Sequence, residues 1–343
     1  MTEPGARTPP RGSRWTRRQV LAGLGAGLIG VPLLAHSTSS RLLDLAQAQA
    51  APLWGAGRSV AAQGGPETMF DRDRAWAHLI AQVDAGPRVP NMPGHATIRE
   101  YLLRELGALS DRVDTQDFVW EVRGTPLSMT NPYALFGPDV PNKVLVTAHW
   151  DTRPQADQDP NPANRQTPIP GANDGASGVA ILLEVARVLR AVPPRVGVIV
   201  MLLDGEDYGP GVDAMFLGSR YLARNIVPER PAWGILLDMV GDRDLHIPRE
   251  GYSQQFAPAV NDRVWRAAAE LGRTEFENTT GMPILDDHVP LAEAGLPMID
   301  LIDFSFGPGH SWWHTLEDTP DKCSAASLEA VGQVVLRTIY NEA

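Results

Sequence analysis

Cysteine is almost absent from the sequence: Cys323 is the only one in 343 residues. A single cysteine excludes an intrachain disulfide, and it excludes a zinc site built from several thiolates. Any metal site in this chain must therefore draw its ligands from histidine, aspartate and glutamate.

Positive charge is also in short supply. The chain has 30 Lys and Arg residues against 41 Asp and Glu residues, which gives a formal net charge of −11. A predominantly acidic surface repels nucleic acids and anionic membranes, so neither is expected as a partner. Neutral or cationic small substrates are compatible with this charge.

An apolar run long enough to span a membrane is missing. Residues 20–35 fall short of the roughly 20 apolar residues that a spanning helix needs, and their glycines and Pro32 weaken the run further. The pattern Thr16-Arg17-Arg18 precedes this run and is typical of twin-arginine export. We interpret residues 1–50 as a twin-arginine signal peptide and flexible N-terminus, cleaved near 46–48; an uncleaved N-terminal anchor is the alternative. The mature chain is then expected in the periplasm or outside the cell, without a membrane span.

Apolar strand-like runs alternate with helix-like segments over the rest of the chain. This alternation is typical of an α/β fold, and the continuous apolar run at 198–203 fits a strand covered on both faces. We predict a three-layer αβα sandwich with a mixed, mostly parallel central sheet. A single domain at 66–343 is expected, although the length also allows two. Strands are predicted at 143–148, 196–203, 234–240 and 297–302, and helices at 70–83, 94–106, 175–189, 216–224, 260–271 and 324–340.

Polar residues gather at the predicted carboxyl ends of these strands, where open α/β sheets carry their functional groups. Each group has an ordinary explanation: Asp174 fits a helix cap, and His149 and Asp238 fit solvated turns. Glu206 with Asp207 fits an acidic turn. Taken together, two histidines and four carboxylates at strand ends favour a bound ligand. The groups are His149-Trp150-Asp151, 171–175, 204–207, Asp238, Asp286-Asp287-His288 and Trp313-His314-Thr315.

Three of these residues, Asp174, Asp207 and His314, offer the nitrogen and carboxylate ligands that zinc prefers. A catalytic zinc site has three protein ligands and one open position. Glu206 and Asp207 are adjacent at a strand end and point in different directions. Asp207 can therefore bind the metal while Glu206 stands over the open position as a general base.

The order of these motifs resembles the zinc aminopeptidase superfamily, from about residue 70 to the C-terminus. The shared pattern is His-x-Asp, Gly-Ala-Asn-Asp, a pair of acids, Asp-Met-x-Gly and a late histidine. For members with two zinc ions, the resemblance implies that Asp174 bridges the metals. One ion would be completed by His149 and Asp238, and the other by Asp207 and His314.

A closer resemblance is to the animal-type glutaminyl cyclases and their bacterial relatives. It rests on residues 148–153, on 216–222 and, above all, on the Asp-Asp-His-Val-Pro sequence at 286–290, where ordinary aminopeptidases tend to carry Ser-Asp-His. The resemblance implies that Asp286, together with Asp238, shares protons with a catalytic Glu206. It also implies that Trp313, with Trp150, contributes to the substrate site.

The sequence departs from the cyclase pattern at three points. Asp207 stands where a glutamate ligand is expected and is one methylene shorter, so either its loop lies closer or the metal shifts. Asp300 occupies the place of a histidine in the animal enzymes. The disulfide of the animal enzymes cannot form, which we take to be without effect on the mechanism.

The resulting hypothesis is a zinc enzyme that cyclises the N-terminal glutamine of peptides or proteins to pyroglutamate. One zinc, held by Asp174, Asp207 and His314, and a monomeric chain are expected. The main alternative is a secreted aminopeptidase with two zinc ions, in which Glu206 activates the bridging water. A non-catalytic ectodomain of the same fold is a more remote alternative.

Overall fold

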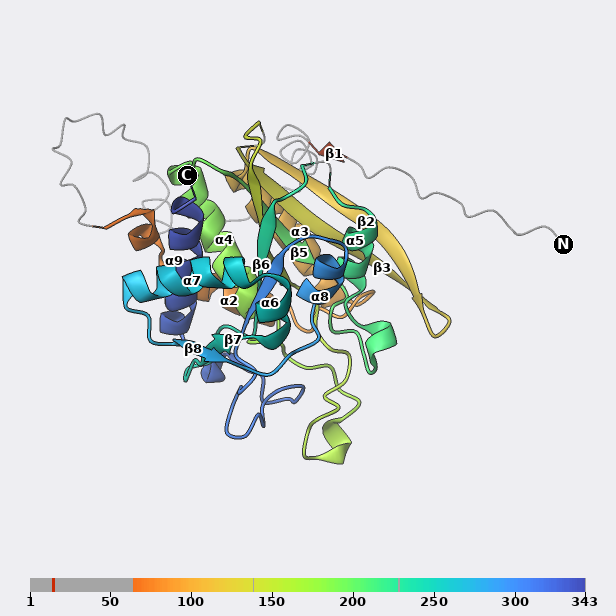
Figure 1. Cartoon of the computed structure of the whole chain (residues 1–343). Helices are drawn as coiled ribbons and strands as arrows, with labels where there is room; N and C mark the ends of the chain where they lie inside the picture. The colour runs from red at the N-terminus through yellow and green to blue at the C-terminus, as the bar shows by residue number, and fades with distance from the viewer. Residues whose placement is uncertain (1–13, 16–63, 138, 228, 343) are drawn as a thin grey trace, which may run out of the picture.

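The structure, a computed structural model, describes residues 14–15, 64–137, 139–227 and 229–342 (Figure 1). The twin-arginine motif, the apolar run at 20–35 and the cleavage site at 46–48 lie outside the described residues. Within the described part of the chain, no helix is both long and apolar enough to cross a membrane.

A seven-stranded mixed sheet forms the centre of the molecule, in the order β1-β2-β3-β5-β4-β6-β9. Strands β5, β4, β6 and β9 run parallel to one another, whereas β2 and β3 form an antiparallel hairpin that joins β5. The sheet strands are β1 (Arg14–Trp15), β2 (Arg112–Val122), β3 (Thr125–Phe136), β4 (Lys143–His149), β5 (Gly197–Leu203), β6 (Trp233–Asp238) and β9 (Met298–Ile302). A separate ribbon pairs β7 (Ile247–Arg249) with β8 (Phe276–Thr280).

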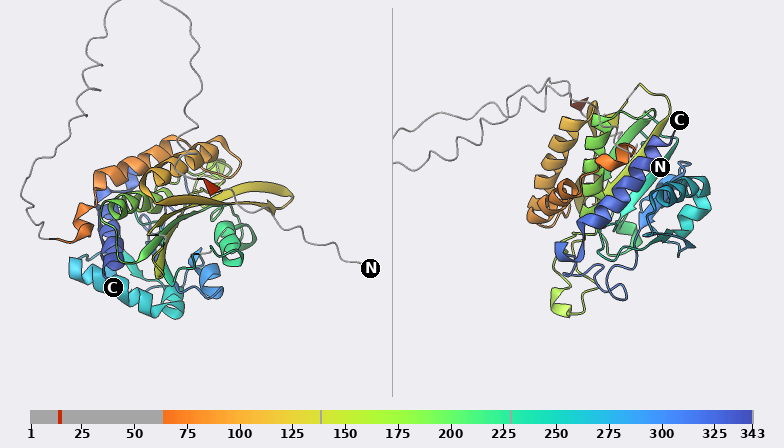
Figure 2. Two further views of the ribbon diagram at one scale, coloured as in Figure 1. Left: turned by 90° about the horizontal axis from the view of Figure 1, so that it is seen from above. Right: turned by 90° about the vertical axis from the view of Figure 1, so that its left-hand side faces the viewer.

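Helices cover both faces of this sheet and confirm the three-layer prediction (Figures 1 and 2). Helices α2, α3, α4 and α9 form one layer, α5 and α8 belong to the other, and α6 and α7 contact the edge strand β9. The α-helices are α2 (Arg72–Asp84), α3 (Pro93–Leu109), α4 (Ala176–Ala191), α5 (Leu217–Arg224), α6 (Gly251–Phe256), α7 (Pro258–Leu271), α8 (His288–Glu293) and α9 (Ala325–Tyr340). Short 3-10 turns are η1 (Pro66–Met69), η2 (Pro162–Asn164), η3 (Val212–Ala214) and η4 (Pro320–Lys322).

The two faces of β4 explain why its central residues 144–146 are all apolar. Val144 and Val146 pack into the large core with α4 and α9, whereas Leu145 packs into a second core with residues of α5 and α8. Successive side chains of a strand point to opposite faces, so a strand with helices on both sides needs apolar residues at every position.

The β2–β3 hairpin is the part of the sheet that the sequence analysis missed. Its strands pair from Arg112 with Leu135 to Val122 with Thr125. β2 alternates polar and apolar residues irregularly, and Val119 is 66% exposed. β3 contains two prolines, Pro126 and Pro132, which argue against a strand in a sequence pattern.

The parallel strands end at one edge of the sheet, and this edge carries the polar groups. His149 is the last residue of β4 and Asp238 is the last residue of β6. The segment that begins at Asp204 directly follows β5. The predicted gathering of functional side chains at the carboxyl ends of the strands is therefore what the fold produces.

Candidate metal centre

Asp174, Asp207 and His314 converge at this edge. All three are buried, and one ligand atom from each lies within 4.8 Å of the others. His314 Nε2 lies 3.2 Å from Asp207 Oδ1 and 3.7 Å from Asp174 Oδ2. Asp174 comes from the loop before α4, Asp207 from the turn after β5, and His314 from the loop between β9 and η4. The fold thus brings together three side chains that are distant in sequence.

The chemistry of this group fits a zinc ion. Zinc binds imidazole nitrogen and carboxylate oxygen, and a catalytic zinc site has three protein ligands and a fourth position that stays open. Asp207 Oδ2 is buried without a hydrogen-bond partner among the described residues. A buried oxygen of this kind is costly unless something satisfies it, and a bound cation would do so.

Neighbouring side chains fix the position of Asp207. Arg153 Nη1 donates to Asp207 Oδ1 at 2.7 Å, and Arg153 Nε donates to Asp157 Oδ1 at 2.6 Å. The carboxylate of Asp151 accepts the backbone N–H groups of Glu206 at 3.0 Å and of Asp207 at 3.2 Å. The turn that carries the predicted base Glu206 and the predicted ligand Asp207 is therefore fixed by hydrogen bonds to its backbone and to the Asp207 side chain.

The loop that carries Asp174 is anchored by Asp318. The Asp318 carboxylate accepts the backbone N–H of Asn173 at 2.7 Å and that of Asp174 at 3.2 Å. Next along the chain, Gly175 follows a cis peptide bond and lies against His149. A Cβ atom at this position would lie 2.5 Å from His149 Nε2, so glycine is required for the close approach.

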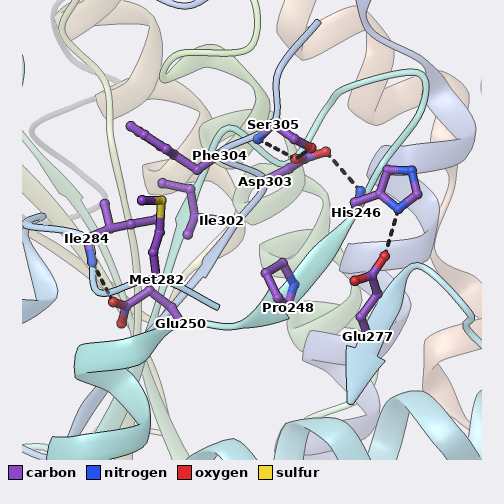
Figure 3. Close-up of a pocket in the computed structure, with 10 residues that line it drawn as sticks. All are labelled: His246, Pro248, Glu250, Glu277, Met282, Ile284, Ile302, Asp303, Phe304 and Ser305. Carbon is purple, nitrogen blue, oxygen red and sulfur yellow. Dashed lines mark hydrogen bonds and ion pairs between the residues drawn. The ribbon is translucent and has the colours of Figure 1, made fainter. Parts of the chain in front are cut away.

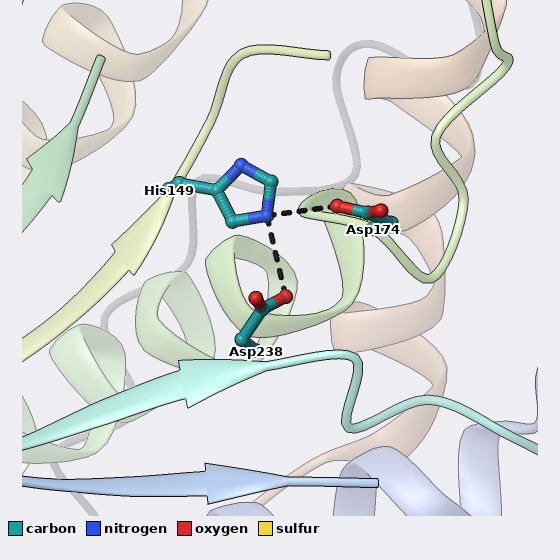
Figure 4. A group of neighbouring side chains, drawn as sticks. All are labelled: His149, Asp174 and Asp238. Atoms are coloured by element: carbon teal, nitrogen blue, oxygen red, sulfur yellow. Dashed lines mark hydrogen bonds and ion pairs between the residues drawn. The ribbon is translucent and has the colours of Figure 1, made fainter. Parts of the chain in front are cut away.

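A second group consists of His149, Asp174 and Asp238 (Figure 4). His149 Nε2 lies 3.1 Å from Asp174 Oδ1 and 3.3 Å from Asp238 Oδ1. Burial lowers the pKa of His149, but the facing carboxylates, Asp238 foremost, raise it well above its ordinary value. The residues predicted to hold a second metal thus converge, and here they form ion pairs with one another.

Glu206, the predicted general base, borders the second group. Its Oε2 lies 3.7 Å from His149 Nδ1, and the side chain is buried. Burial raises the pKa of Glu206 well above its ordinary value; the charge of His149 opposes this shift, and that of Asp286 adds to it. A glutamate whose pKa is raised in this way is suited to accept and return a proton.

Three further carboxyl groups form a chain next to Glu206. Asp286 lies beside the carboxyl groups of Asp238 and Asp300: the charge of Asp238 raises the pKa of Asp286, and the charge of Asp286 raises that of Asp300. Burial, followed by the charge of Asp238, raises the pKa of Asp286 to about 8. Asp300 is completely buried, and its pKa is raised well above the ordinary value by burial and by Asp286. At the position of the cyclase histidine, this chain therefore has a carboxyl group that favours its protonated form.

The two tryptophans of the predicted substrate site have different surroundings. Trp313 is half-buried, and its ring stacks on His314 with 3.6 Å between the centroids. Trp150 has no exposed surface; it stacks on His95 at 4.2 Å, and its Nε1 donates to the backbone oxygen of Thr130 at 3.1 Å. The expectation that Trp150 contacts substrate is corrected to a packing role, because a fully covered ring has no face left for a ligand.

Some residues around the metal centre were not identified from sequence. Arg153 was noted only as part of the 148–153 segment, and Asp157 and Asp318 were given no role. Arg153 follows His149 by four residues in a loop, a spacing that carries no structural signal of its own. A buried arginine among ligand carboxylates can be found only once the fold is known.

Comparison with known proteins places these observations in context. A model of peptidase family M28 matches residues 133–339. The solved glutaminyl cyclase of Bacteroides thetaiotaomicron is 40% identical, with a TM-score of 0.77, and the match covers 80% of this chain and 99% of that one. A leucine aminopeptidase precursor from the same organism is 41% identical, also with a TM-score of 0.77, over 80% of this chain and 98% of that one.

Curated relatives carry names of the same two kinds. The Bos taurus glutaminyl-peptide cyclotransferase-like protein is 27% identical over 267 residues, which is 68% of this chain and 66% of the relative. The Bacillus subtilis aminopeptidase YwaD is 30% identical over 215 residues, which is 58% of this chain. The match spans only 41% of the length of that aminopeptidase. Similarity alone therefore leaves the choice between the two reactions to the site.

Proposed function

Since the chain belongs to peptidase family M28, we propose that it is a zinc-dependent glutaminyl-peptide cyclotransferase. It would convert the N-terminal glutamine of peptides or proteins to pyroglutamate and release ammonia. The observation that carries the proposal is Asp286, which is buried beside Asp238 and whose charge acts on Glu206. This is the position at which the cyclase resemblance departs from the aminopeptidases.

Asp207 supports the first group as the place of the catalytic metal ion, because it has a buried oxygen without a partner among the described residues. We propose that Asp174, Asp207 and His314 hold a single catalytic zinc.

Glu206 would carry the proton in the reaction. Bound zinc would supply positive charge that polarises the oxygen of the substrate's γ-carboxamide. The neutral α-amine attacks the carboxamide carbon while Glu206 accepts one of its protons. Glu206 then returns this proton to the amide nitrogen, the carbon–nitrogen bond breaks, and ammonia leaves. Because the nucleophile belongs to the substrate, correct positioning supplies much of the rate enhancement.

Asp286 and Asp238 would support this transfer. Their shared proton keeps one carboxyl group neutral, so it can donate a hydrogen bond to the substrate's amide nitrogen or to Glu206. Asp300 would extend the same network from the other side of Asp286.

The test compares two reactions on one preparation. Purified, zinc-loaded protein is incubated with Gln-peptides and, separately, with Leu-, Ala- and Arg-anilides. Ammonia release and amide hydrolysis are both followed. Ammonia release with conversion of Gln-peptides is expected; fast hydrolysis without cyclisation would overturn the proposal.

The aminopeptidase is the alternative that a specific observation favours. His149, Asp174 and Asp238 offer ligand atoms within 4.8 Å of one another, which is what a second ion needs. Metal stoichiometry separates the two. One tightly held zinc per chain at full activity supports the cyclase, whereas two support the aminopeptidase.

We also propose that residues 1–50 direct twin-arginine export and that 66–343 acts as a monomeric catalytic domain in the periplasm or outside the cell. Changing Arg17 and Arg18 together to lysine is expected to leave the enzyme inside the cell. Unchanged export of the double variant would contradict this.

A further inference from the structure

We propose that the cavity beside the metal centre is a subsite for a lysine or arginine side chain at the second position of the peptide substrate. This inference rests on the proposed function, because it assumes that the first residue of a peptide lies at the metal. It goes further by naming a class of peptide.

The cavity has a volume of about 280 Å³ and lies at the same edge of the sheet as the metal ligands (Figure 3). Ile302, the last residue of β9, and the following residues 303–305 form one side. The β7–β8 ribbon and the segment 282–284 form the rest. It is thus framed by elements that are separate from the ligand-bearing turns.

Two ring contacts connect the cavity to the metal centre. Phe304 lines the cavity and meets Trp313 edge to face, with 5.4 Å between the ring centroids. Trp313 in turn stacks on the proposed ligand His314 at 3.6 Å. One peptide residue spans about 3.5 Å of extended chain. A substrate whose first residue lies at the metal therefore has its second side chain within reach of Phe304.

One wall of the cavity is apolar. Met282, Ile284, Ile302 and Phe304 lie together on one side in Figure 3. Met282 is 62% exposed, which is unusual for a large apolar side chain and leaves its surface available to a ligand. An aliphatic chain laid along this wall would be removed from water.

The opposite end is acidic. Glu277 and Asp303 lie at this end with a single imidazole, that of His246, and none of the described lining residues is Lys or Arg. Glu250 lies at the apolar end and pairs with His288 at 3.1 Å. His246 Nδ1 contacts Glu277 Oε1 at 2.8 Å, and the backbone N–H of His246 donates to Asp303 Oδ2 at 2.9 Å. Two carboxylates against one imidazole leave an excess of negative charge at this end. A side chain with an apolar stem and a cationic tip matches both ends.

A second groove beyond Asp286 contains two arginines, unlike the cavity, so the sign of the charge preference tells the two apart. Arg220 and Arg224 line it together with Asp286 and Glu293. Arg220 Nη2 already donates to the backbone oxygen of Val212 at 2.9 Å, and the Arg224 guanidinium lies over the Trp120 ring. If peptides followed this groove, an acidic second residue would be preferred.

The experiment measures binding separately from turnover. Zinc-loaded Glu206→Gln, which lacks the proton acceptor and keeps the three ligands, is titrated calorimetrically with Gln-Lys-Ala-Ala, Gln-norleucine-Ala-Ala and Gln-Glu-Ala-Ala. Norleucine keeps the stem of lysine without its charge. We expect the lysine peptide to bind about two- to fivefold more tightly than the norleucine peptide, as one partly exposed charge pair allows. The glutamate peptide should bind most weakly, and moving lysine to the fourth position should abolish the preference.

Glu277→Gln, introduced into the same background, tests the acidic end. It should reduce the ratio of lysine to norleucine affinity to near one, whereas Glu121→Gln, the same change at an exposed position of β2, should leave the ratio unchanged. Equal affinities in the parent protein, tighter binding of the glutamate peptide, or no binding of any peptide would overturn the subsite. If these peptides bind as expected but wild-type enzyme releases no ammonia from them, the proposed function fails and the subsite stands.

Discussion

On the two sides of Asp174, the pKa values of buried carboxyl groups are shifted in opposite directions. On the side of Asp207 and His314, Arg153 lies among the carboxylates: burial alone would raise the pKa of Asp157, but the hydrogen bond and charge of Arg153 bring it below the ordinary value. On the side of Asp238, carboxyl groups face one another. There burial and mutual repulsion raise the pKa of Asp286 to about 8.

This difference separates two tasks within one cluster of acids. Ionised carboxylates held by a fixed cation are ready to bind metal, because metal ligands must be deprotonated. Carboxyl groups with raised pKa values keep protons and can pass them to a substrate. We refer to the first as the metal side (Asp174, Asp207, His314) and to the second as the proton side (Asp238, Glu206, Asp286).

The strongest test of the comparison replaces one histidine on each side of Asp174. His314→Ala is expected to lose zinc and all activity, because it removes one of three ligands. His149→Ala should keep one zinc per chain, since His149 is paired with carboxylates. Zinc content after gel filtration, measured by atomic absorption, decides between them. Loss of zinc in both variants would mean that the two groups act as one metal site.

Glu206→Gln is expected to impair proton transfer and to leave zinc binding intact. Turnover should fall by about 10²–10⁴-fold, the range attributed to a positioned acid or base, while zinc content stays at the wild-type level. The comparison is made by ammonia release from a Gln-peptide on zinc-loaded samples. A variant that loses its zinc would place Glu206 on the metal side.

Arg153→Gln weakens the metal side without touching a ligand. The change removes the charge that holds Asp207, and we expect zinc affinity to fall by about 10–100-fold, as for other groups that orient metal ligands. Competition with a chromogenic chelator measures the affinity. Arg104→Gln, at an exposed position of α3, serves as the matched control, and equal affinities in both variants would rule out the positioning role.

The smallest expected effect concerns pH. In zinc-free protein the folded-state pKa of Asp286 is about 8 against an ordinary value of 3.8, so folding takes up a proton. Its contribution to stability is complete below 3.8 and is lost as pH rises towards 8. Asp286→Asn should therefore flatten the decline of the unfolding free energy between pH 5 and 8, by at most about 1.4 kcal/mol per pH unit. Urea unfolding at several pH values measures this, with Asp213→Asn as an exposed control; an unchanged slope would argue that Asp286 does not hold the proton.

How much of the fold can be predicted from the sequence depends on how clear the apolar pattern of each element is. Strands β4, β5, β6 and β9 are recognisable because helices cover both of their faces, which requires unbroken apolar runs. The β2–β3 hairpin was missed because one exposed face and two prolines blur its pattern. Helices α6 and α8, with six residues each, are too short to show a period.

The same holds for the site. Asp174, Asp207 and His314 could be proposed as ligands because each sits in a recognisable motif. Arg153, Asp157 and Asp318 could not, because their roles depend on contacts between segments that only the folded chain brings together. Trp150 was assigned to substrate because it adjoins a motif, and sequence adjacency does not show which way a side chain faces.

The hydrogen bonds between Asp318 and the loop of Asp174 determine when the proposed metal site can form during synthesis of the chain. These residues are 144 positions apart, and both backbone N–H groups of the loop depend on a carboxylate from near the C-terminus. Such distant contacts form late in folding, since closing a long loop is entropically costly. A nascent chain whose segment 314–318 has not yet left the ribosome therefore has neither the proposed ligand His314 nor Asp318 in place, and the proposed metal site can form only after that segment has emerged.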